Sequence, residues 1–162
     1  MAVQPYASVT GAQQGPFKGE TTQKGRENMI PLVAYRYGVI SPYDVATGQA
    51  SGKRQHEPVV ITKEWGASSP QFYTAAYTGE ILTSVMLNFF LTNTKGVQQL
   101  DHTIQLTNAR IILVQQSLHL PQSAGPVIDC RELQEISFTF QKIQITSISG
   151  GTEAADDWSI LT

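Results

Sequence analysis

Apolar and polar side chains alternate along much of this chain, and two neighbouring stretches show the alternation most clearly. Val85–Leu91 places an apolar residue at every second position, and Thr103–Thr107 alternates polar with apolar side chains. Successive side chains of a β-strand point to opposite faces, so each stretch is predicted to be a strand. Asn93–Gly96 lies between them and has the composition of a turn, which predicts a hairpin.

Three other stretches are apolar without clean alternation. Pro58–Thr62 is rich in β-branched residues and is predicted to be a strand with its proline at the first position. Met29–Tyr37 alternates imperfectly, and Ala109–Val114 is almost continuously apolar. Strands covered by protein on both faces carry such runs, so we expect both faces of these two to be covered. Pro121–Pro126 is expected to interrupt the chain after the second.

A short helix is predicted directly after the Pro58–Thr62 strand. Ser69-Pro70 is a helix start, because a serine hydroxyl accepts a hydrogen bond from a free N–H and proline lacks that N–H. Phe72 and Ala75 follow at one-face spacing, and Gly79 is suited to a left-handed stop. Trp65, between strand and helix, is expected to be packed in the core.

The stretch Ile136–Ile145 contains a change of phase. Ile136, Phe138 and Phe140 occupy one set of alternate positions, whereas Ile143 and Ile145 occupy the other. A β-bulge between Gln141 and Lys142 would shift the register by one residue and bend the strand. The predicted fold is therefore mainly β, a compact antiparallel β-barrel with one short flanking α-helix, in a single domain spanning residues 1–162.

The segment before Pro58 is polar and carries two glycines, so it is predicted to be a loop that stands out in solvent. Its residues are Thr47, Gly48, Gln49, Ser51, Gly52, Lys53, Arg54, Gln55 and His56. Lys53 and Arg54, with His56, could bind an anion, but two adjacent cations are usually a solvated loop tip.

Composition narrows the function further. Charged residues are 15 % of the 162 residues and the formal net charge is −2, which gives no electrostatic reason to expect a nucleic-acid partner. Cys130 is the single cysteine, so an intrachain disulfide is excluded and a reducing compartment is expected for folding. Met1–Gly11 lacks the apolar run of a signal peptide, and no segment reaches the roughly 18 apolar residues that span a bilayer. We expect no membrane insertion and, for any export, another machine.

No catalytic, cofactor or metal site is predicted. The sequence lacks the H-E-x-x-H, C-x-x-C and G-x-S-x-G motifs, and His56, His102 and His119 occur singly. Cys130 has no histidine near it in sequence, so it is interpreted as an inert side chain. Asp156-Asp157 without further ligands is interpreted as a solvated turn, whereas the adjacent Trp158 is a candidate for an interface.

Several separated motifs resemble the haemolysin-coregulated protein (Hcp) family, which builds the tube of bacterial type VI secretion systems. The motifs span nearly the whole chain, in the family's order and spacing: Gly15-x-Phe17-Lys18-Gly19-Glu20, Tyr37-Gly38-Val39-x-Ser41-Pro42, Gly48-Gln49-x-Ser51-Gly52-Lys53-Arg54-Gln55-His56, Pro58-Val59-Val60-Ile61-Thr62-Lys63, Ser69-Pro70-Gln71 and Ile136-Ser137-Phe138-x-Phe140-Gln141-Lys142-Ile143. The resemblance implies a β-barrel with a flanking helix that forms hexameric rings.

The resemblance also implies a structural, non-enzymatic role. The rings would stack into a tube that a contractile sheath expels together with a spike protein, and the tube would carry effector proteins. The chain would assemble in the cytoplasm and then be secreted without a signal peptide. The polar loop Thr47–His56 is the candidate for stacking rings, and the resemblance implies that Lys53 and Arg54 pair with acidic side chains of a neighbouring subunit. Asp156, Asp157 and Trp158 are candidate interface residues. Composition alone leaves a different class open, a β domain that binds a small ligand or carbohydrate.

Overall fold

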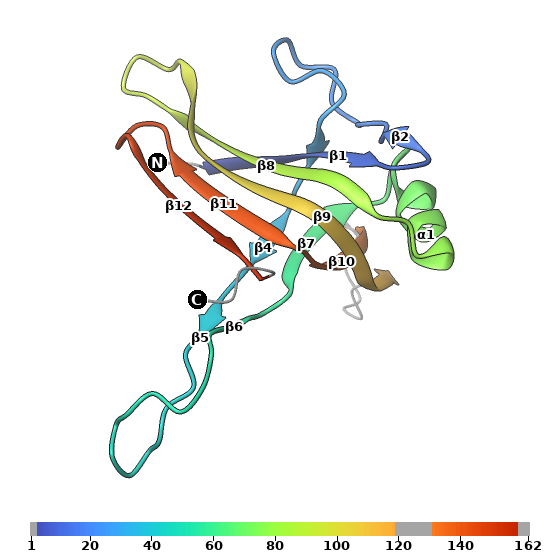
Figure 1. Cartoon of the computed structure of the whole chain (residues 1–162). Coiled ribbons are helices and arrows are strands. Elements are labelled where there is room, and N and C mark those ends of the chain that lie inside the picture. The colour runs from blue at the N-terminus through green and yellow to red at the C-terminus, as the bar shows by residue number, and fades with distance from the viewer. Residues whose placement is uncertain (1–2, 119–130, 159–162) are drawn as a thin grey trace, which may run out of the picture.

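The computed structural model describes residues 3–118 and 131–158, which form a mainly antiparallel β structure with one helix (Figure 1). The mainly β prediction with one short helix is therefore confirmed. The elements in chain order are β1 Val3–Gly11, β2 Gly15–Pro16, β3 Ile30–Pro31, β4 Ala34–Arg36, β5 Val39–Ile40, β6 Gln55–His56, β7 Val59–Glu64, α1 Ser69–Thr78, β8 Leu82–Thr92, β9 Gln98–Leu118, β10 Glu132–Thr139, β11 Lys142–Ser147 and β12 Thr152–Asp157.

The long strand β9 connects the two halves of the sheet. The main strand order is β2-β1-β8-β9-β10-β7-β4, and β5 pairs with β6 in a separate ribbon. The first half of β9 lies between β8 and β11, whereas its second half pairs with β10. β12 continues the sheet beyond β11. The predicted hairpin is present as β8 and β9, which fold back around Asn93–Gly96.

The sheet bends toward a barrel but does not close into one. The segment of residues 30–36 crosses the open side as two short strands, β3 on β1 and β4 on β7. Between them, the N–H of Leu32 donates to the Pro5 carbonyl and the N–H of Val33 donates to the Thr62 carbonyl. The single strand expected for Met29–Tyr37 is therefore two pieces, because the segment changes partner at its middle.

The apolar core lies inside this curved sheet. Val85, Leu87 and Phe89 of β8 are buried at alternate positions, as predicted, and belong to one core cluster with buried residues of β7 and β10. Helix α1 covers one end: Phe72 packs edge-on against Phe17 at 5.1 Å and near Phe138 at 6.3 Å between ring centroids. Such edge-to-face contacts between buried rings fix how the helix sits on the sheet.

The boundaries of α1 agree with the prediction, but its first turn is stabilised differently. Gly79 ends the helix with φ of 65°, as expected for a left-handed cap. The residue at the N-cap is Ser68, and its side chain makes no cap hydrogen bond with the helix. The Ser69 hydroxyl accepts hydrogen bonds from Lys63 and from the N–H of Gly66, so the predicted serine cap is wrong.

Two expectations about burial are wrong. Trp65 is 45 % exposed, because β7 ends at Glu64 and the side chain that follows lies at the rim of the sheet. The run Ala109–Val114 is not covered on both faces, since Ile112 is 55 % and Leu113 is 42 % exposed.

The phase change near Gln141 has another cause than a bulge. Thr139 pairs with Arg110 and Lys142 pairs with Thr107, so the register between the two strands is unchanged across the break. Both strands change face together, because Asn108 on β9 has φ of 51° and its amide donates to the Gln141 side chain at 2.8 Å. A left-handed asparagine turns the strand over without inserting a residue. The register shift in this ladder lies between Ser137 and Phe138.

Candidate functional site

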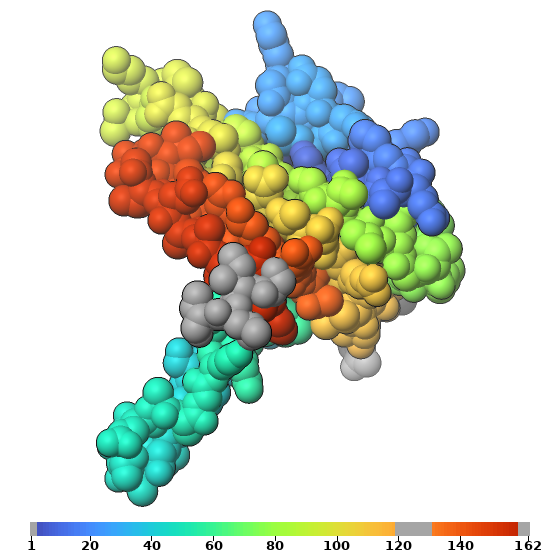
Figure 2. All heavy atoms as spheres, in the orientation of Figure 1, coloured from blue at the N-terminus to red at the C-terminus, as the bar shows by residue number. Residues whose placement is uncertain are grey.

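A narrow arm projects from the body of the molecule (Figures 1 and 2). We define the arm as residues 39–56, in which β5 and β6 form the root and a bridge between Tyr43 and Ala50 continues the ribbon. The turn is closed by the N–H of Asp44, which donates to the Gln49 carbonyl, and by Gly48, which has φ of 72°. The predicted polar loop Thr47–His56 is thus one side of the arm, and its residues from 47 to 53 are all exposed, as expected.

The other side of the arm carries apolar residues near the tip that the sequence analysis passed over. Val45 is 86 % exposed and Tyr43 is 62 % exposed. Asp44 lies between them, and its carboxylate accepts a hydrogen bond from the N–H of Ala46 within the turn. The tip therefore combines two large exposed apolar side chains with one acidic group.

Polar and charged side chains join the root of the arm to Asp156 of β12. Arg54 donates two hydrogen bonds to the Asp156 carboxylate, at 2.5 Å from Nε and 2.6 Å from the terminal nitrogen. His56 places Nε2 at 2.6 Å from Asp156 and Nδ1 at 2.8 Å from the Tyr37 hydroxyl. Because a planar guanidinium matches a carboxylate in two places, this pairing fixes direction as well as distance.

Aromatic rings enclose the histidine of this cluster. The His56 ring stacks on Trp158 with centroids 5.3 Å apart and lies near Tyr37 at 6.1 Å, while Phe140 meets it edge-on at 5.3 Å. The side chain of His56 is only 4 % exposed. Trp158 is 49 % exposed, so one part of its surface rests on the arm root and the rest faces solvent.

The cluster shifts the acid–base properties of its members. The hydrogen bonds from Arg54, together with the single hydrogen bond to His56, lower the pKa of Asp156 to about 2 despite partial burial. The same bond raises the pKa of Arg54, and burial with the nearby Asp156 charge raises the pKa of the Tyr37 hydroxyl. Asp156 is therefore an ionised acceptor at every pH at which the protein is expected to work.

The structure brings together candidate residues that the sequence treats as two separate groups. Arg54 and His56 of the loop contact Asp156 and Trp158 near the end of the chain, about 100 positions later in the sequence. The acceptor of Arg54 is thus in its own chain. Lys53 is exposed and has no ion-pair partner among residues 3–118 and 131–158. Nothing in the spacing of residues 37, 56 and 156 indicates their contact, which depends on β12 lying beside β11.

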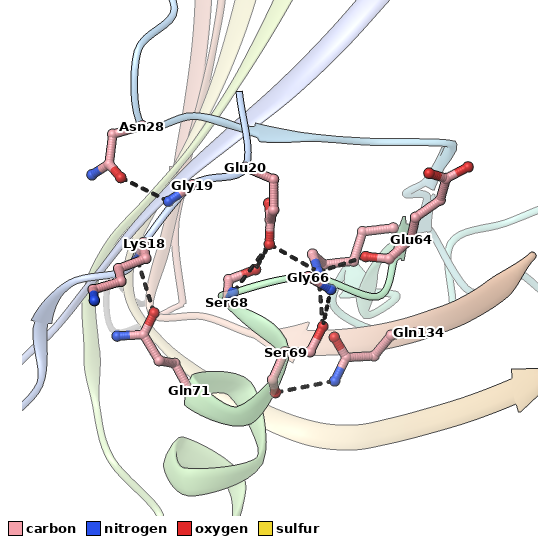
Figure 3. Close-up of polar contacts among 11 residues, drawn as sticks. Lys18, Gly19, Glu20, Asn28, Glu64, Gly66, Ser68, Ser69, Gln71 and Gln134 are labelled. Atoms are coloured by element: carbon pink, nitrogen blue, oxygen red, sulfur yellow. Dashed lines mark hydrogen bonds and ion pairs between the residues drawn. The ribbon is translucent and has the colours of Figure 1, made fainter. Parts of the chain in front are cut away.

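A second polar cluster, which sequence reasoning missed, lies at the start of α1 (Figure 3). Lys63 is 1 % exposed, and its ammonium donates to the Glu64 carbonyl at 2.7 Å and to the Ser69 hydroxyl at 2.9 Å. The Glu20 carboxylate lies 3.3 Å away and also accepts from the backbone N–H and hydroxyl of Ser68, at 3.0 and 2.6 Å. Glu20 thus supplies the negative group that the first turn of α1 lacks.

This cluster joins three segments that are distant in sequence. The excursion of residues 17–29 is tied to α1 by Glu20 and by the N–H of Lys18, which donates to the Gln71 side chain (Figure 3). Gln134 of β10 donates to the Ser69 carbonyl. Burial lowers the pKa of Lys63, and the Glu20 charge opposes that shift. The sequence signal for the cluster is weak: Lys63 shares its phase in β7 with the apolar Val59 and Ile61.

The histidines and acidic side chains of the described residues do not gather into a metal site. Across residues 3–118 and 131–158, no group of three histidine, cysteine, aspartate or glutamate side chains could hold a metal ion. His102 pairs with the adjacent Asp101, and its ring stacks on Phe89. These two contacts give His102 a structural role in the sheet. His119 and Cys130 lie outside the described residues. Among the described helices, none is long and apolar enough to cross a membrane.

Comparison with known proteins gives consistent similarities over nearly the whole chain. A family model described as "Type VI secretion system effector, Hcp" matches residues 6–146. The "Major exported protein" of Pseudomonas aeruginosa is 34 % identical over 167 residues, covering 98 % of this chain and 96 % of that protein. A crystal structure of an Hcp protein superposes with a TM-score of 0.90 at 28 % identity, covering 98 % of this chain and 99 % of that one. The secreted protein Hcp3 from Pseudomonas aeruginosa gives a TM-score of 0.79 at 29 % identity, covering 98 % and 100 %.

Proposed function

The chain belongs to the Hcp family of type VI secretion proteins, and from that premise we propose that it is a structural subunit of the secretion tube. In this role, six copies form a ring and the rings stack. The observation that carries the proposal beyond family membership is the arm, which its own chain holds firmly at the root and leaves exposed at the tip. A rigid projection with an uncovered end is suited to contact with another subunit.

Ring formation is supported by strand edges and apolar surface that the described residues leave open. Of the residues described, β12 pairs with β11 on one side and with no strand on the other. Ile112 and Leu113 on β9 are exposed as well. Open edges and exposed apolar side chains favour association with further chains, and closed rings are a common way to bury them. We assign Asp156, Asp157 and Trp158 to the region of these contacts.

Stacking of rings is assigned to the arm, and within it to the loop Thr47–His56. The cluster around Asp156 limits the directions in which the arm can extend, so each subunit of a ring would present its tip at the same height. Each contact contributes about 1 kcal/mol if it is an ordinary hydrogen bond, but a six-fold ring repeats it. Lys53 is exposed and charged, which suits it to pair with an acidic group of the next ring.

The remaining parts of the proposal concern partners and location. The subunit assembles in the cytoplasm, is expelled by a contractile sheath behind a spike protein, and carries effectors within the tube. The name "Major exported protein" of a relative with 34 % identity supports export. We assign no enzymatic activity to the chain.

The test uses the full chain and a variant that lacks only the arm tip. Residues 44–49 are replaced by a short glycine-serine turn, which keeps Arg54 and His56 and therefore the contacts of the root. Native mass spectrometry measures ring size, and electron microscopy with a secretion assay measures stacking and export. We expect wild-type hexamers that stack, and variant hexamers that do not. A wild-type monomer at all concentrations would refute the ring, and normal tubes from the variant would refute the role of the arm.

A further inference from the structure

A cavity of about 250 Å³ lies beside the polar cluster at the start of α1. Glu20, Glu64 and Trp65 line it, together with the apolar residues 31–33 of the segment that crosses the open side of the sheet. Val33 is 47 % exposed and Trp65 is 45 % exposed, so the cavity opens to solvent at these two side chains. A space of this size has room for several water molecules or for a small polar group with a short apolar stem.

The Glu20 carboxylate uses its two oxygens unequally. Oε1 accepts hydrogen bonds from the backbone N–H and the hydroxyl of Ser68 and lies 3.3 Å from the Lys63 ammonium. Oε2 is buried and has no hydrogen-bond partner within the described part of the chain. Such an acceptor is uncommon in a folded protein, because it has lost its water without gaining a donor. Since Glu20 lines the cavity, a donor group inside the cavity is suited to complete the bonding of Oε2.

Glu20 is also held in one position. The contacts of Oε1 fix the carboxylate at the start of α1 (Figure 3). The backbone of Gly66 packs so closely on the same side chain that a Cβ at this position would lie 2.5 Å from the Glu20 Cγ. The carboxylate therefore cannot turn to a new partner without losing these contacts. An acceptor that is already oriented binds a donor at a lower entropic cost.

The lining favours a cation with an apolar stem. A carboxylate forms its strongest hydrogen bonds with charged donors, and the indole of tryptophan is the aromatic ring that best attracts a cation. Glu64 adds a second carboxylate to the lining. Lys63 does not fill this role, because its ammonium is 1 % exposed and donates to the Glu64 carbonyl and the Ser69 hydroxyl. Residues 31–33 offer apolar surface for methylene groups.

We propose that this cavity binds an alkylammonium group, the group that ends a lysine side chain. The ammonium donates to Oε2 of Glu20, and the methylene stem lies against Trp65 and residues 31–33. Glu20 thus has two roles, since Oε1 stabilises the first turn of α1 and Oε2 receives the ligand. The site is complete within one chain, so the inference does not depend on the proposed assembly.

Tryptophan fluorescence of the full chain tests the site. Trp65 and Trp158 are the two tryptophans, so Trp158→Phe leaves Trp65 as the single reporter. The probe is n-butylammonium chloride, and n-butanol at the same ionic strength is the neutral control. We expect a saturable change in emission, with the amine binding roughly tenfold more tightly than the alcohol, because a charged donor forms the stronger hydrogen bond.

A second probe distinguishes two sources of the same group. It is a capped tripeptide with lysine at its centre. Binding of the peptide at least as tight as that of n-butylammonium assigns the site to lysine side chains of proteins. Weaker binding of the peptide assigns it to free alkylamines. Either result supports an alkylammonium site.

Matched variants locate the binding. Val33→Tyr places a large side chain in the cavity and leaves Glu20 and Lys63 in place, so it is expected to abolish the response. Val97→Tyr is the control, because Val97 is 54 % exposed and does not line the cavity. It should leave the response unchanged. Glu64→Gln should weaken binding by at most about fivefold, since Glu64 is more than half exposed.

The outcomes are independent of ring formation. A folded Trp158→Phe chain without a saturable response would mean that the cavity holds water only and would overturn the inference. Equal binding of n-butylammonium and n-butanol, or an unchanged response in Val33→Tyr, would overturn it as well. None of these results affects the proposed tube subunit, which native mass spectrometry and electron microscopy test separately.

Discussion

Replacing Glu20 by glutamine should destabilise the fold, although Glu20 lies in a segment without regular structure. The substitution keeps the shape of the side chain and removes its charge. Lys63 would then lie 1 % exposed with no carboxylate beside it, retaining only the Glu64 carbonyl and the Ser69 hydroxyl. The bonds from Ser68 to Glu20 would weaken as well, because a neutral acceptor replaces a charged one.

The expected loss follows from the burial of Lys63. Removing one partner of a buried ion pair costs about 3–5 kcal/mol, because the other charge is left uncompensated. Glu20 keeps 22 % of its side chain exposed, so water reaches part of the site and we expect the lower end, about 3 kcal/mol. For a chain of this size that loss lowers the melting temperature by roughly 6–12 °C.

Chemical denaturation at one fixed protein concentration measures the effect, with circular dichroism and tryptophan fluorescence as probes. Trp65 lines the same cavity as Glu20, so its emission reports on the site. Glu64→Gln is the matched control, since Glu64 pairs with Arg131 at 3.5 Å and both side chains are more than half exposed. Such a surface pair contributes at most about 1 kcal/mol. The double variant Glu20→Gln with Lys63→Met should lose less than the sum of the single losses, because it removes both charges.

The pH dependence of the Glu20→Gln variant gives an independent check. Burial already lowers the pKa of Lys63, and removal of the Glu20 charge lowers it further. The unfolded chain then binds more protons than the folded one at alkaline pH, so stability should rise with pH and the deficit should shrink toward pH 10. Equal losses for Glu20→Gln and Glu64→Gln, or a deficit that does not change with pH, would refute the assignment of Lys63 as a buried, paired charge.

Three further predictions concern the core, the arm root and the end of α1. Trp65→Ala should lower the free energy of unfolding by less than about 1.5 kcal/mol, because the side chain is 45 % exposed. Phe72→Ala should lower it by about 3–5 kcal/mol, because Phe72 is fully buried. Calorimetry of both variants tests the difference. Since the pKa of Asp156 is lowered to about 2, the stability that its charge contributes to the fold is present above pH 4 and is lost as the pH falls toward 2. The melting temperature of Asp156→Asn should therefore change less between pH 4 and pH 2 than that of the wild type. Glu80→Ala leaves the N–H groups of Gln13 and Gln14 without acceptors and should cost about 1–3 kcal/mol, and denaturant titration that finds no loss would contradict this.

Local patterns in the sequence determine much of the fold. Alternation along β8 and the first half of β9 predicts the hairpin, because the period of a strand is independent of what covers it. The end of α1 at Gly79 is equally local, since only the backbone of that residue is involved. The exposure of residues 47–53 follows from their lack of large apolar side chains, whereas Arg54 and His56 at the end of the same loop are partly covered. Its identification with ring stacking depends on the family resemblance.

The tertiary structure decides whatever depends on the partner of a residue. Trp65 has the chemistry of a core residue, but the end of β7 leaves it at a rim. Lys63 follows the predicted strand Pro58–Thr62, and only the path of residues 17–29 brings Glu20 to it. Arg54 and Asp156 are 102 positions apart, and their pairing requires β12 to lie beside the arm root.

The change of face at Gln141 is visible in the sequence, but its cause, a left-handed Asn108 on the neighbouring strand, is not. Sequence periodicity records which face of a strand is apolar, whereas the identity of the covering group is set by long-range strand pairing, for which a single sequence carries little local signal.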